Sequence, residues 1–279
     1  MYSRVYVEIT NACNLSCSFC HGHSRALSFM SETQFLHILD CLAGKTKYVY
    51  YHLMGEPLLH PALGHFLTLA RERGFSSIIT TNGTLLGSRG EELIRGGALH
   101  KINISVHSLE NADAIARQRY LDSVIDFAEC ATESSVIVIL RLWNRGYDGE
   151  LNAYVLDTLR ERFGGAWREN TRGIRIHDKL HVEWGDRFVW PDKEAPLIGE
   201  RVFCYGLADH FGILCDGTVV PCCLDGDGVI ALGNVFETPL EEILASDRAI
   251  KIREGFAKRC APEELCRRCG YATRFQRRL

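Results

Sequence analysis

The chain has 279 residues, of which 46% are hydrophobic, and its formal net charge at pH 7 is −3. This length is enough for one large domain with a buried core and a smaller second domain, and the charge argues against a general attraction to nucleic acid or to anionic membranes. The apolar runs are too short to span a bilayer, and residues 1–4 lead directly into a predicted strand where a secreted protein would have a signal peptide, so we expect a cytoplasmic location without membrane attachment.

The first predicted strand, residues 5–10, is followed by a loop that carries three closely spaced cysteines. Cys13, Cys17 and Cys20 have the spacing C-x3-C-x2-C. A [4Fe–4S] cube has four iron corners, so a loop with three thiolates leaves one iron open to a small molecule. A zinc knuckle is the alternative, and it would need a closed set of four ligands, to which a neighbouring histidine could contribute. Twelve cysteines in a reducing compartment favour metal ligation over disulfides.

Short β-branched runs alternate with amphipathic helical stretches as far as about residue 190. This pattern predicts repeated βα units and a parallel sheet. A capping box from Ser31 to Gln34 begins one helix, which ends near Gly44, and Pro61 begins another, which ends near Gly74. The further predicted strands cover residues 48–53, 77–81, 101–106, 136–142 and 174–177.

Small or polar residues stand where several of these strands end. They are Gly55, Glu56, Asn82, Ser105, His107 and Arg141. We expect them at one edge of the sheet, because reactive residues of such folds lie at the C-terminal ends of the strands. A small residue at position 55 leaves backbone carbonyls accessible, the Glu56 carboxylate suits a cation, and the Arg141 guanidinium matches a carboxylate. An ordinary turn is the alternative for residues 55–56 and 82–83.

The composition changes after the predicted βα units, and we place a domain boundary near residue 195. A β-hairpin is predicted over residues 211–223, where Asp216 and Gly217 supply the positive φ angles of a tight turn. A helix follows over residues 239–256. Seven of the twelve cysteines lie beyond the boundary, which indicates a second metal site.

The N-terminal part of the chain resembles the radical S-adenosylmethionine (radical SAM) enzymes. The resemblance rests on the cysteine spacing, on the aromatic Phe19, and on Gly55 and Glu56 one βα unit later, although Met54 stands where the family has a first glycine. It implies an α/β fold, a partial (β/α)6 TIM-like barrel over residues 1–195, and a [4Fe–4S] cluster that binds S-adenosylmethionine. The implied ligands and contacts are Cys13, Cys17 and Cys20 on the cluster, Phe19 near the adenine, Gly55 and Glu56 at the methionyl ammonium, Ser105 or His107 at the ribose, Arg141 at the carboxylate, and Asn82 at the same strand edge.

The C-terminal part, residues 196–279, resembles the auxiliary-cluster domain called SPASM, in its shorter form called Twitch. The resemblance implies a small β-hairpin and helix domain with one auxiliary [4Fe–4S] cluster. The implied ligands are Cys204, Cys222, Cys266 and Cys269. Cys260 is the alternative to Cys204, and zinc is the alternative to the cluster because it uses the same thiolates.

These resemblances imply reductive cleavage of S-adenosylmethionine and abstraction of a hydrogen atom from a substrate. The auxiliary cluster suggests a net oxidation, because it can accept an electron from the substrate radical. We expect oxidation or cross-linking of a peptide or protein, and a dehydrogenase of a small molecule such as an amino-cyclitol is the alternative. An external low-potential electron donor such as flavodoxin or ferredoxin is implied. A non-catalytic zinc-binding scaffold protein is the hypothesis from a different class.

Overall fold

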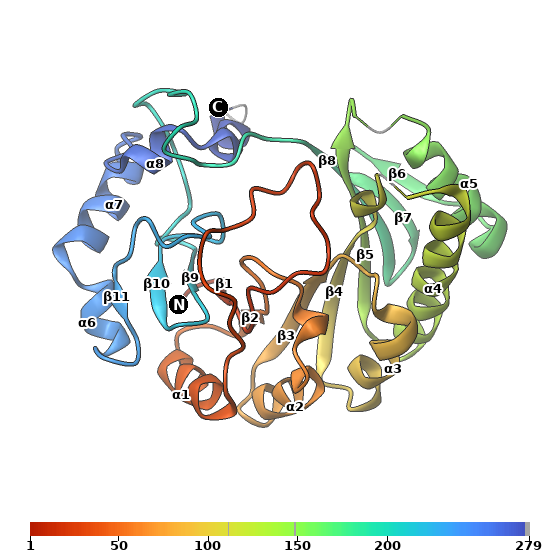
Figure 1. Cartoon of the computed structure of the whole chain (residues 1–279), viewed down its shortest axis with the longest axis horizontal. Coiled ribbons are helices and arrows are strands. Elements are labelled where there is room, and N and C mark those ends of the chain that lie inside the picture. Colours follow the sequence, from red (N-terminus) through yellow and green to blue (C-terminus); the bar gives the residue numbers. More distant parts are fainter. Residues whose placement is uncertain (111, 148, 277–279) are drawn as a thin grey trace. The chain divides into compact units, whose positions relative to one another are not determined.

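The computed structural model describes residues 1–110, 112–147 and 149–276. Its contacts divide these residues into two compact units, each with some of the strands labelled in Figure 1. Unit 1 consists of Met1–His60, Glu72–Phe75 and the described residues from Phe188 onward, and unit 2 of the described residues in Pro61–Arg71 and Ser76–Arg187. No helix in the described ranges is both long and apolar enough to cross a membrane.

Unit 1 combines strands from both ends of the chain. Its strands are β1 (Arg4–Val7), β2 (Tyr48–Tyr50), β9 (His210–Ile213), β10 (Thr218–Val220) and β11 (Gly233–Asn234). β1 pairs in parallel with β2 on one side and with β9 on the other, and β10 and β11 continue from β9 as antiparallel strands. Val5, Val7 and Ile213 are completely buried, so this pairing forms part of the core. The expected C-terminal hairpin is confirmed, and it extends the sheet of the N-terminal strand.

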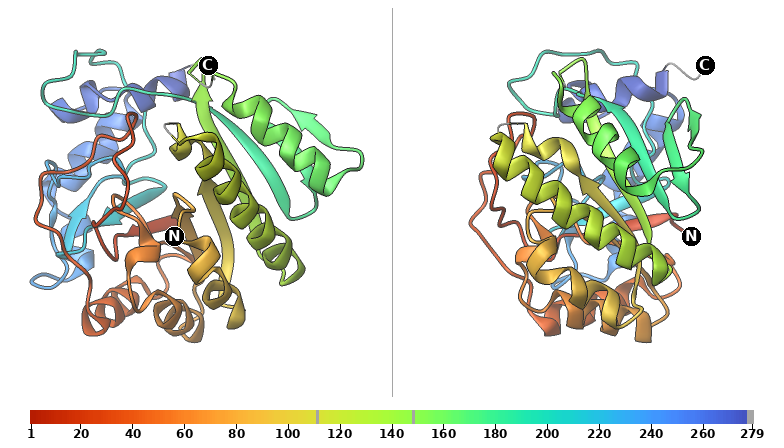
Figure 2. Two further views of the ribbon diagram at one scale, coloured as in Figure 1. Left: turned by 45° about the vertical axis from the view of Figure 1, so that its right-hand side comes forward. Right: turned by 90° about the vertical axis from the view of Figure 1, so that its right-hand side faces the viewer.

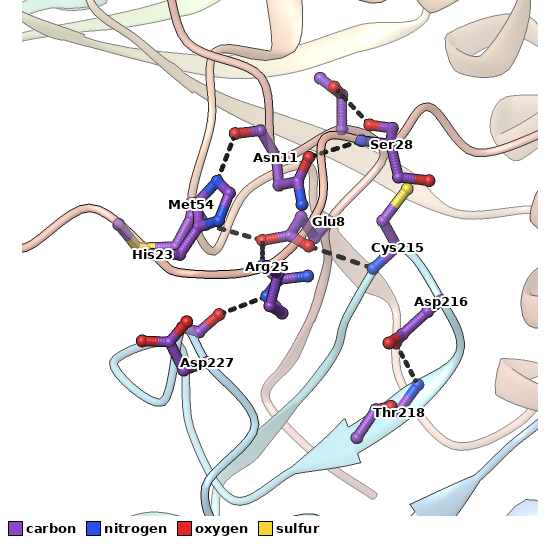
Figure 3. Close-up of polar contacts among 12 residues, drawn as sticks. Glu8, Asn11, His23, Arg25, Ser28, Met54, Cys215, Asp216, Thr218 and Asp227 are labelled. Atoms are coloured by element: carbon purple, nitrogen blue, oxygen red, sulfur yellow. Dashed lines mark hydrogen bonds and ion pairs between the residues drawn. The ribbon is translucent and has the colours of Figure 1, made fainter. Parts of the chain in front are cut away.

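The turn of this hairpin differs from the expected one. Gly217 has a φ of 88°, whereas Asp216 is not among the residues with positive φ. The amide of Gly217 donates to the carbonyl of Leu214 at 2.9 Å, and Asp216 Oδ1 accepts from the amide of Thr218 at 3.0 Å (Figure 3). Gly217 alone supplies the left-handed conformation, and Asp216 stabilises the turn through its side chain.

The helices of unit 1 confirm one expectation and correct another. Helix α1 (Glu32–Leu42) begins with the expected capping box, in which Ser31 and Gln34 exchange two hydrogen bonds. The single helix expected over residues 239–256 is wrong, because α6 (Leu240–Leu244) ends at its C-cap Ala245 and Ser246 caps a new helix, α7 (Asp247–Ala257). The other helical segments of this unit are η1 (Pro57–Leu59), α8 (Glu264–Arg267), η3 (Gly270–Ala272) and α9 (Thr273–Gln276).

Unit 2 contains successive βα units. Its strands are β3 (Ser76–Thr81), β4 (Leu99–Ser105), β5 (Ile137–Arg145), β6 (Arg168–Asn170), β7 (Gly173–His177) and β8 (Leu180–Asp186). Its helices are α2 (Leu63–Glu72), α3 (Leu86–Arg95), η2 (Val106–Leu109), α4 (Ala114–Glu133) and α5 (Leu151–Phe163). β3, β4, β5 and β8 pair in parallel in that order, and β7 and β6 continue as antiparallel strands. Figure 2 shows the long helix α4 running beside β5.

Residues 174–177 form a strand, as expected, but they do not supply the sixth parallel strand. These residues lie in β7, which runs antiparallel, and β8 takes the parallel position beside β5. Leu180 and Val182 of β8 are buried, whereas His181 and Glu183 between them are half-buried. β8 therefore has one apolar face, and its polar alternate residues concealed the strand in the sequence.

Candidate cluster and cofactor site

The three N-terminal cysteines lie on a loop of unit 1 that starts soon after β1. Cys13 and Cys20 are exposed and Cys17 is half-buried, and the amide of Cys20 donates to the carbonyl of Cys17 at 3.1 Å. The buried Asn11 fixes the base of the loop, because its side chain donates to one backbone carbonyl and accepts from the amide of Ser28, both at 2.8 Å (Figure 3). The loop therefore holds its thiols near the surface on a fixed base.

Gly55 and Glu56 lie against the start of this loop. The amide of Glu56 donates to the carbonyl of Ala12 at 2.7 Å. Gly55 has a φ of 77°, and a Cβ atom at this position would lie 2.4 Å from the carbonyl oxygen of Thr10, so glycine permits the close approach. The Glu56 residue is 1% exposed, and its Oε1 accepts from the amide of Leu58 at 3.0 Å. The structure thus brings this expected pair next to the cysteine loop.

Glu8 is a buried carboxylate in the same unit that the sequence reasoning missed. It is completely buried, and its two oxygens accept from the amides of Met54 and Cys215, each at 3.1 Å. Arg25 Nη2 lies 2.6 Å from Oε1 (Figure 3). One carboxylate therefore joins β1, the segment after β2, the hairpin turn and the loop that follows the cysteines. A lone acid in an apolar strand was the available signal.

A cavity of about 370 Å³ in unit 1 is lined by the four cysteines expected at the auxiliary site, Cys204, Cys222, Cys266 and Cys269. Cys223 also lines it, whereas Cys260 is exposed. Burial raises the pKa of the Cys204 thiol to about 11 and raises the pKa of Cys222 and Cys266 well above the ordinary thiol value. Within residues 1–110, 112–147 and 149–276, no three His, Cys, Asp or Glu side chains come close enough together to hold a single ion. Ligation by these thiols requires the loss of their protons.

Polar side chains of β1 and β9 line the same cavity. Arg4 Nη2 lies 3.1 Å from Asp209 Oδ2, and Tyr6 lines the cavity together with Cys223. Burial lowers the pKa of His210 to about 4, so this imidazole is neutral at pH 7. The cavity therefore combines buried thiols with a cation and hydrogen-bonding groups, which suits a negatively charged thiolate-ligated centre.

Three of the other expected cofactor residues lie together in unit 2. Ser105 and Arg141 are register partners on β4 and β5, and His107 Nδ1 lies 3.0 Å from the carbonyl oxygen of Arg141. Burial lowers the pKa of His107 to about 4, so its ring is neutral at pH 7. Arg141 Nε lies 3.3 Å from Glu183 Oε2, and its guanidinium carbon lies 4.6 Å from the ring centroid of Trp143. This edge of unit 2 is therefore polar and preorganised.

Asn82 follows the end of β3, and its carbonyl accepts from the hydroxyl of Ser108, the residue after His107, at 3.3 Å. Its Oδ1 accepts from the amide and the hydroxyl of Thr84, at 2.9 and 2.7 Å, and its carbonyl accepts from the hydroxyl of Tyr120 at 2.8 Å. The Asn82 side chain therefore stabilises its own turn.

Phe19 is half-buried within the cysteine loop. Its carbonyl accepts a hydrogen bond of 2.8 Å from Nε1 of Trp190. Trp190 is a second residue that sequence reasoning missed, because a tryptophan beside a proline in a polar stretch gives no signal for a contact with a distant loop.

Two family models match this chain. The model of the radical SAM superfamily matches residues 7–161, which is more than half of the chain. The SPASM model, described as an iron–sulfur cluster-binding domain, matches residues 204–270. Each of the two expected cysteine sets lies within one of the matched segments.

Curated proteins and solved structures also include similar chains. GTP 3′,8-cyclase from Chlorobaculum tepidum is 30% identical over 164 residues, which are 54% of this chain and 48% of that protein, so the chain spans about half of this relative. BtrN in complex with AdoMet and 2-DOIA is 18% identical, with a TM-score of 0.55, and the match covers 96% of this chain and 93% of that chain. SuiB of Streptococcus suis bound to precursor peptide SuiA is 15% identical, with a TM-score of 0.52, and the match covers 97% and 70%. These similarities show the fold and confirm the expected α/β class with a partial TIM-like barrel.

Proposed function

Because this chain belongs to the radical SAM superfamily and carries a SPASM domain, we propose that it is an oxidoreductase that cleaves S-adenosylmethionine and oxidises a substrate through an auxiliary cluster. The two families imply S-adenosylmethionine, a [4Fe–4S] cluster that binds it, and an auxiliary iron–sulfur cluster. Bound by the three thiolates of the cysteine loop and reduced, such a cluster would supply one electron for cleavage of S-adenosylmethionine to methionine and a 5′-deoxyadenosyl radical, which would remove a hydrogen atom from the substrate. The observation that carries the proposal is the cavity with four cysteines, in the same compact unit as the C-x3-C-x2-C loop.

We assign the first cluster to Cys13, Cys17 and Cys20. Three thiolates at this spacing leave one iron corner for the cofactor. The exposed and half-buried thiols are accessible to an incoming cluster, and Asn11 holds the base of their loop. Phe19 belongs to the same loop, so its ring is our candidate for the contact with adenine.

Gly55 and Glu56 are our candidates for the methionyl ammonium. The close approach of Gly55 to Thr10 brings this segment against the cysteine loop. The Glu56 carboxylate is buried there, and a charge-assisted hydrogen bond to an ammonium is stronger in a buried site than in water.

The candidates in unit 2 are Ser105, His107, Arg141 and Asn82. Neutral His107 and the Ser105 hydroxyl can exchange hydrogen bonds with ribose hydroxyls without a change of charge. The Arg141 guanidinium has five donors in a planar fork. It can therefore bind the methionyl carboxylate while it keeps its ion pair with Glu183. Asn82 has a weaker case, because its side-chain oxygen already accepts two hydrogen bonds.

We assign the auxiliary cluster to Cys204, Cys222, Cys266 and Cys269, in a domain that begins near residue 195. The exposure of Cys260 supports Cys204 as the fourth ligand, because Cys204 lines the cavity. The role proposed for this cluster is to accept one electron from the substrate radical. Transfer of a hydrogen atom to the 5′-deoxyadenosyl radical, of one electron to the auxiliary cluster and of one proton to solvent would oxidise the substrate by two electrons overall.

The proposed substrate is a peptide or protein that is oxidised or cross-linked. The solved complex of SuiB with a precursor peptide supports this class. A small molecule such as an amino-cyclitol is the second candidate, because the match to BtrN covers 93% of that chain whereas the match to SuiB covers 70% of SuiB. We further propose a cytoplasmic location, where flavodoxin or ferredoxin would supply the low-potential electron.

The test is a cleavage assay on the anaerobically reconstituted chain. With dithionite, we expect 5′-deoxyadenosine and methionine to form slowly from S-adenosylmethionine, as measured by liquid chromatography and mass spectrometry. Panels of peptides and of amino-cyclitols are then compared for an increase in that rate and for a product two mass units lighter. A chain that binds zinc at both cysteine sets and does not cleave S-adenosylmethionine would instead be the scaffold protein.

A further inference from the structure

Residues 188–192 of unit 1 contact the N-terminal cysteine loop. Trp190 Nε1 donates to the carbonyl of Phe19 at 2.8 Å, and Phe19 lies between Cys17 and Cys20. His21, the residue after Cys20, lies 3.4 Å from a carboxylate oxygen of Asp192. Its ring is nearly parallel to that of Trp190, with an interplanar angle of 17°. One short segment thus holds the cysteine loop at two adjacent points.

The same segment also contacts the auxiliary-site motif. The amide of Gly270, the residue after Cys269, donates to the carbonyl of Val189 at 3.0 Å. The ring of Phe188 meets the ring of Tyr271 edge-on, with the centroids 5.0 Å apart, and Tyr271 lines the same cavity as Cys269. A Cβ atom at position 270 would lie 2.7 Å from the Val189 carbonyl oxygen, so glycine permits this contact. Residues 188–192 therefore connect the two cysteine motifs directly.

We propose that Trp190 is a positioning residue for S-adenosylmethionine binding, which holds the cysteine loop in its binding geometry by attaching it to the auxiliary-site motif. The inference rests on the proposed function. Its physical basis is that Cys13 and Cys20 are exposed, so burial does little to fix the loop and hydrogen bonds must contribute to its geometry. The hydrogen bond from Trp190 to the Phe19 carbonyl fixes the orientation of the peptide unit that joins Phe19 to Cys20. The amide of the same peptide unit donates the hydrogen bond of 3.1 Å to the carbonyl of Cys17.

Packing alone does not explain the position of Trp190, because the residue is only half-buried. Its indole N–H has a partner 171 residues away in the chain, and the neighbouring Val189 binds the other motif through its backbone. Residues 188–192 therefore contact both cysteine motifs. Such a continuous set of contacts is what allows the auxiliary-site motif to affect the geometry of the N-terminal cysteine loop.

The first experiment uses Trp190→Phe in the full-length, anaerobically reconstituted protein. Phenylalanine keeps an aromatic ring but removes the N–H donor. We expect the iron content to equal that of the unaltered chain, whereas the dissociation constant for S-adenosylmethionine rises roughly two- to tenfold, as the loss of one hydrogen bond predicts. The cofactor-induced change in the electron paramagnetic resonance spectrum of the reduced cluster should need correspondingly more S-adenosylmethionine. Trp167→Phe is the control, because Trp167 makes the same kind of bond, 2.9 Å to the Gly164 carbonyl, in unit 2.

The second experiment displaces the segment from its other end. Gly270→Ala forces Val189 away without altering any polar side chain, so we expect it to weaken S-adenosylmethionine binding as Trp190→Phe does. Gly64→Ala is its control, because the nearest atom to a Cβ at position 64 is 3.8 Å away. Unchanged affinity and spectra in both test variants would overturn the inference, as would loss of iron from both sites in Trp190→Phe. A failure of the proposed function is distinct, because the unaltered chain would then show no cofactor cleavage.

Discussion

A Cβ atom on Gly55 would lie 2.4 Å from the carbonyl oxygen of Thr10. A carbon and an oxygen atom that are not bonded to each other do not approach this closely, so only glycine fits at position 55. The segment after β2 therefore packs directly against the residues between β1 and the cysteine loop. Glu8 and Arg25 hold the same region, through the hydrogen bond to Met54 and the ion pair shown in Figure 3. The geometry of the candidate cofactor site therefore depends on close backbone contacts within unit 1.

Gly55→Ala should separate these two segments. The methyl group cannot fit, and an alanine at this positive φ costs about 1–3 kcal/mol, so we expect loss of S-adenosylmethionine binding in equilibrium dialysis and a lower iron content. Gly74→Ala is the matched control, because Gly74 has a φ of 81° with no atom within 4 Å of the added Cβ. Equal behaviour of the two variants would mean that backbone strain, and not the approach to Thr10, causes the defect.

Glu56→Gln removes one charge but keeps an oxygen that can accept from the amide of Leu58. If the carboxylate binds the methionyl ammonium, the binding free energy of S-adenosylmethionine should become less favourable by about 1.5–3 kcal/mol, which raises the dissociation constant roughly tenfold or more. Thermal unfolding should change little. Isothermal titration of the reconstituted protein measures the affinity, with the exposed Glu237→Gln as control. An unchanged affinity removes Glu56 from the cofactor site.

Replacing Cys13, Cys17 and Cys20 together by alanine should halve the metal content. Two [4Fe–4S] clusters hold about eight iron atoms, so about four should remain in the variant. Iron and sulfide analysis measures both values, and Cys130→Ala, an exposed cysteine on α4, should retain all of the iron. Zinc without iron in the unaltered chain would contradict the cluster assignment.

The double variant Cys266→Ala and Cys269→Ala separates oxidation from redox-neutral chemistry. It should still cleave S-adenosylmethionine, because the first cluster has its own ligands, but it should not release oxidised substrate. The substrate radical should instead recover a hydrogen atom and regenerate the substrate. The panels of peptides and amino-cyclitols identify the substrate, and its deuterium-labelled form would reveal this exchange of hydrogen. Cys260→Ala should behave as the unaltered chain does. Oxidised product at the native rate from a folded double variant would exclude the electron-acceptor role.

Acid should destabilise the metal-free chain partly through His107. Burial lowers its folded-state pKa to about 4, whereas the unfolded value is about 6.5. As the pH falls through this range the unfolded state binds the proton first, so the stability that is present above pH 6.5 decreases, by about 1.4 kcal/mol for each pH unit between the two pKa values. His210 titrates over the same range, so His107→Gln should remove only part of the effect. Urea unfolding between pH 7 and 4 measures this change in the free energy of unfolding. The variant His65→Gln, at an exposed position, is the control.

Local sequence predicted the features that depend on neighbouring residues. The Ser31 capping box, the hairpin around Gly217 and the cysteine spacings are all set within a few residues, so their patterns are readable. Strands β1 to β5 were also found, although β1 ends at Val7 and β2 at Tyr50, each earlier than expected. Strand ends depend on where the partner strand stops, which periodicity does not report.

Only the tertiary structure decided which distant residues meet. β8, which pairs with β5, has the parallel position that was predicted for residues 174–177. In the auxiliary site, Cys204 lines the cavity whereas Cys260 is exposed. Glu8 binds the amide of Cys215 across 207 residues of chain, and Trp190 binds Phe19 across 171. Such contacts depend on the burial and hydrogen bonding of groups brought together by folding. The sequence by itself determined the cysteine motifs and the βα pattern, and the fold decided which backbone and side-chain groups hold them.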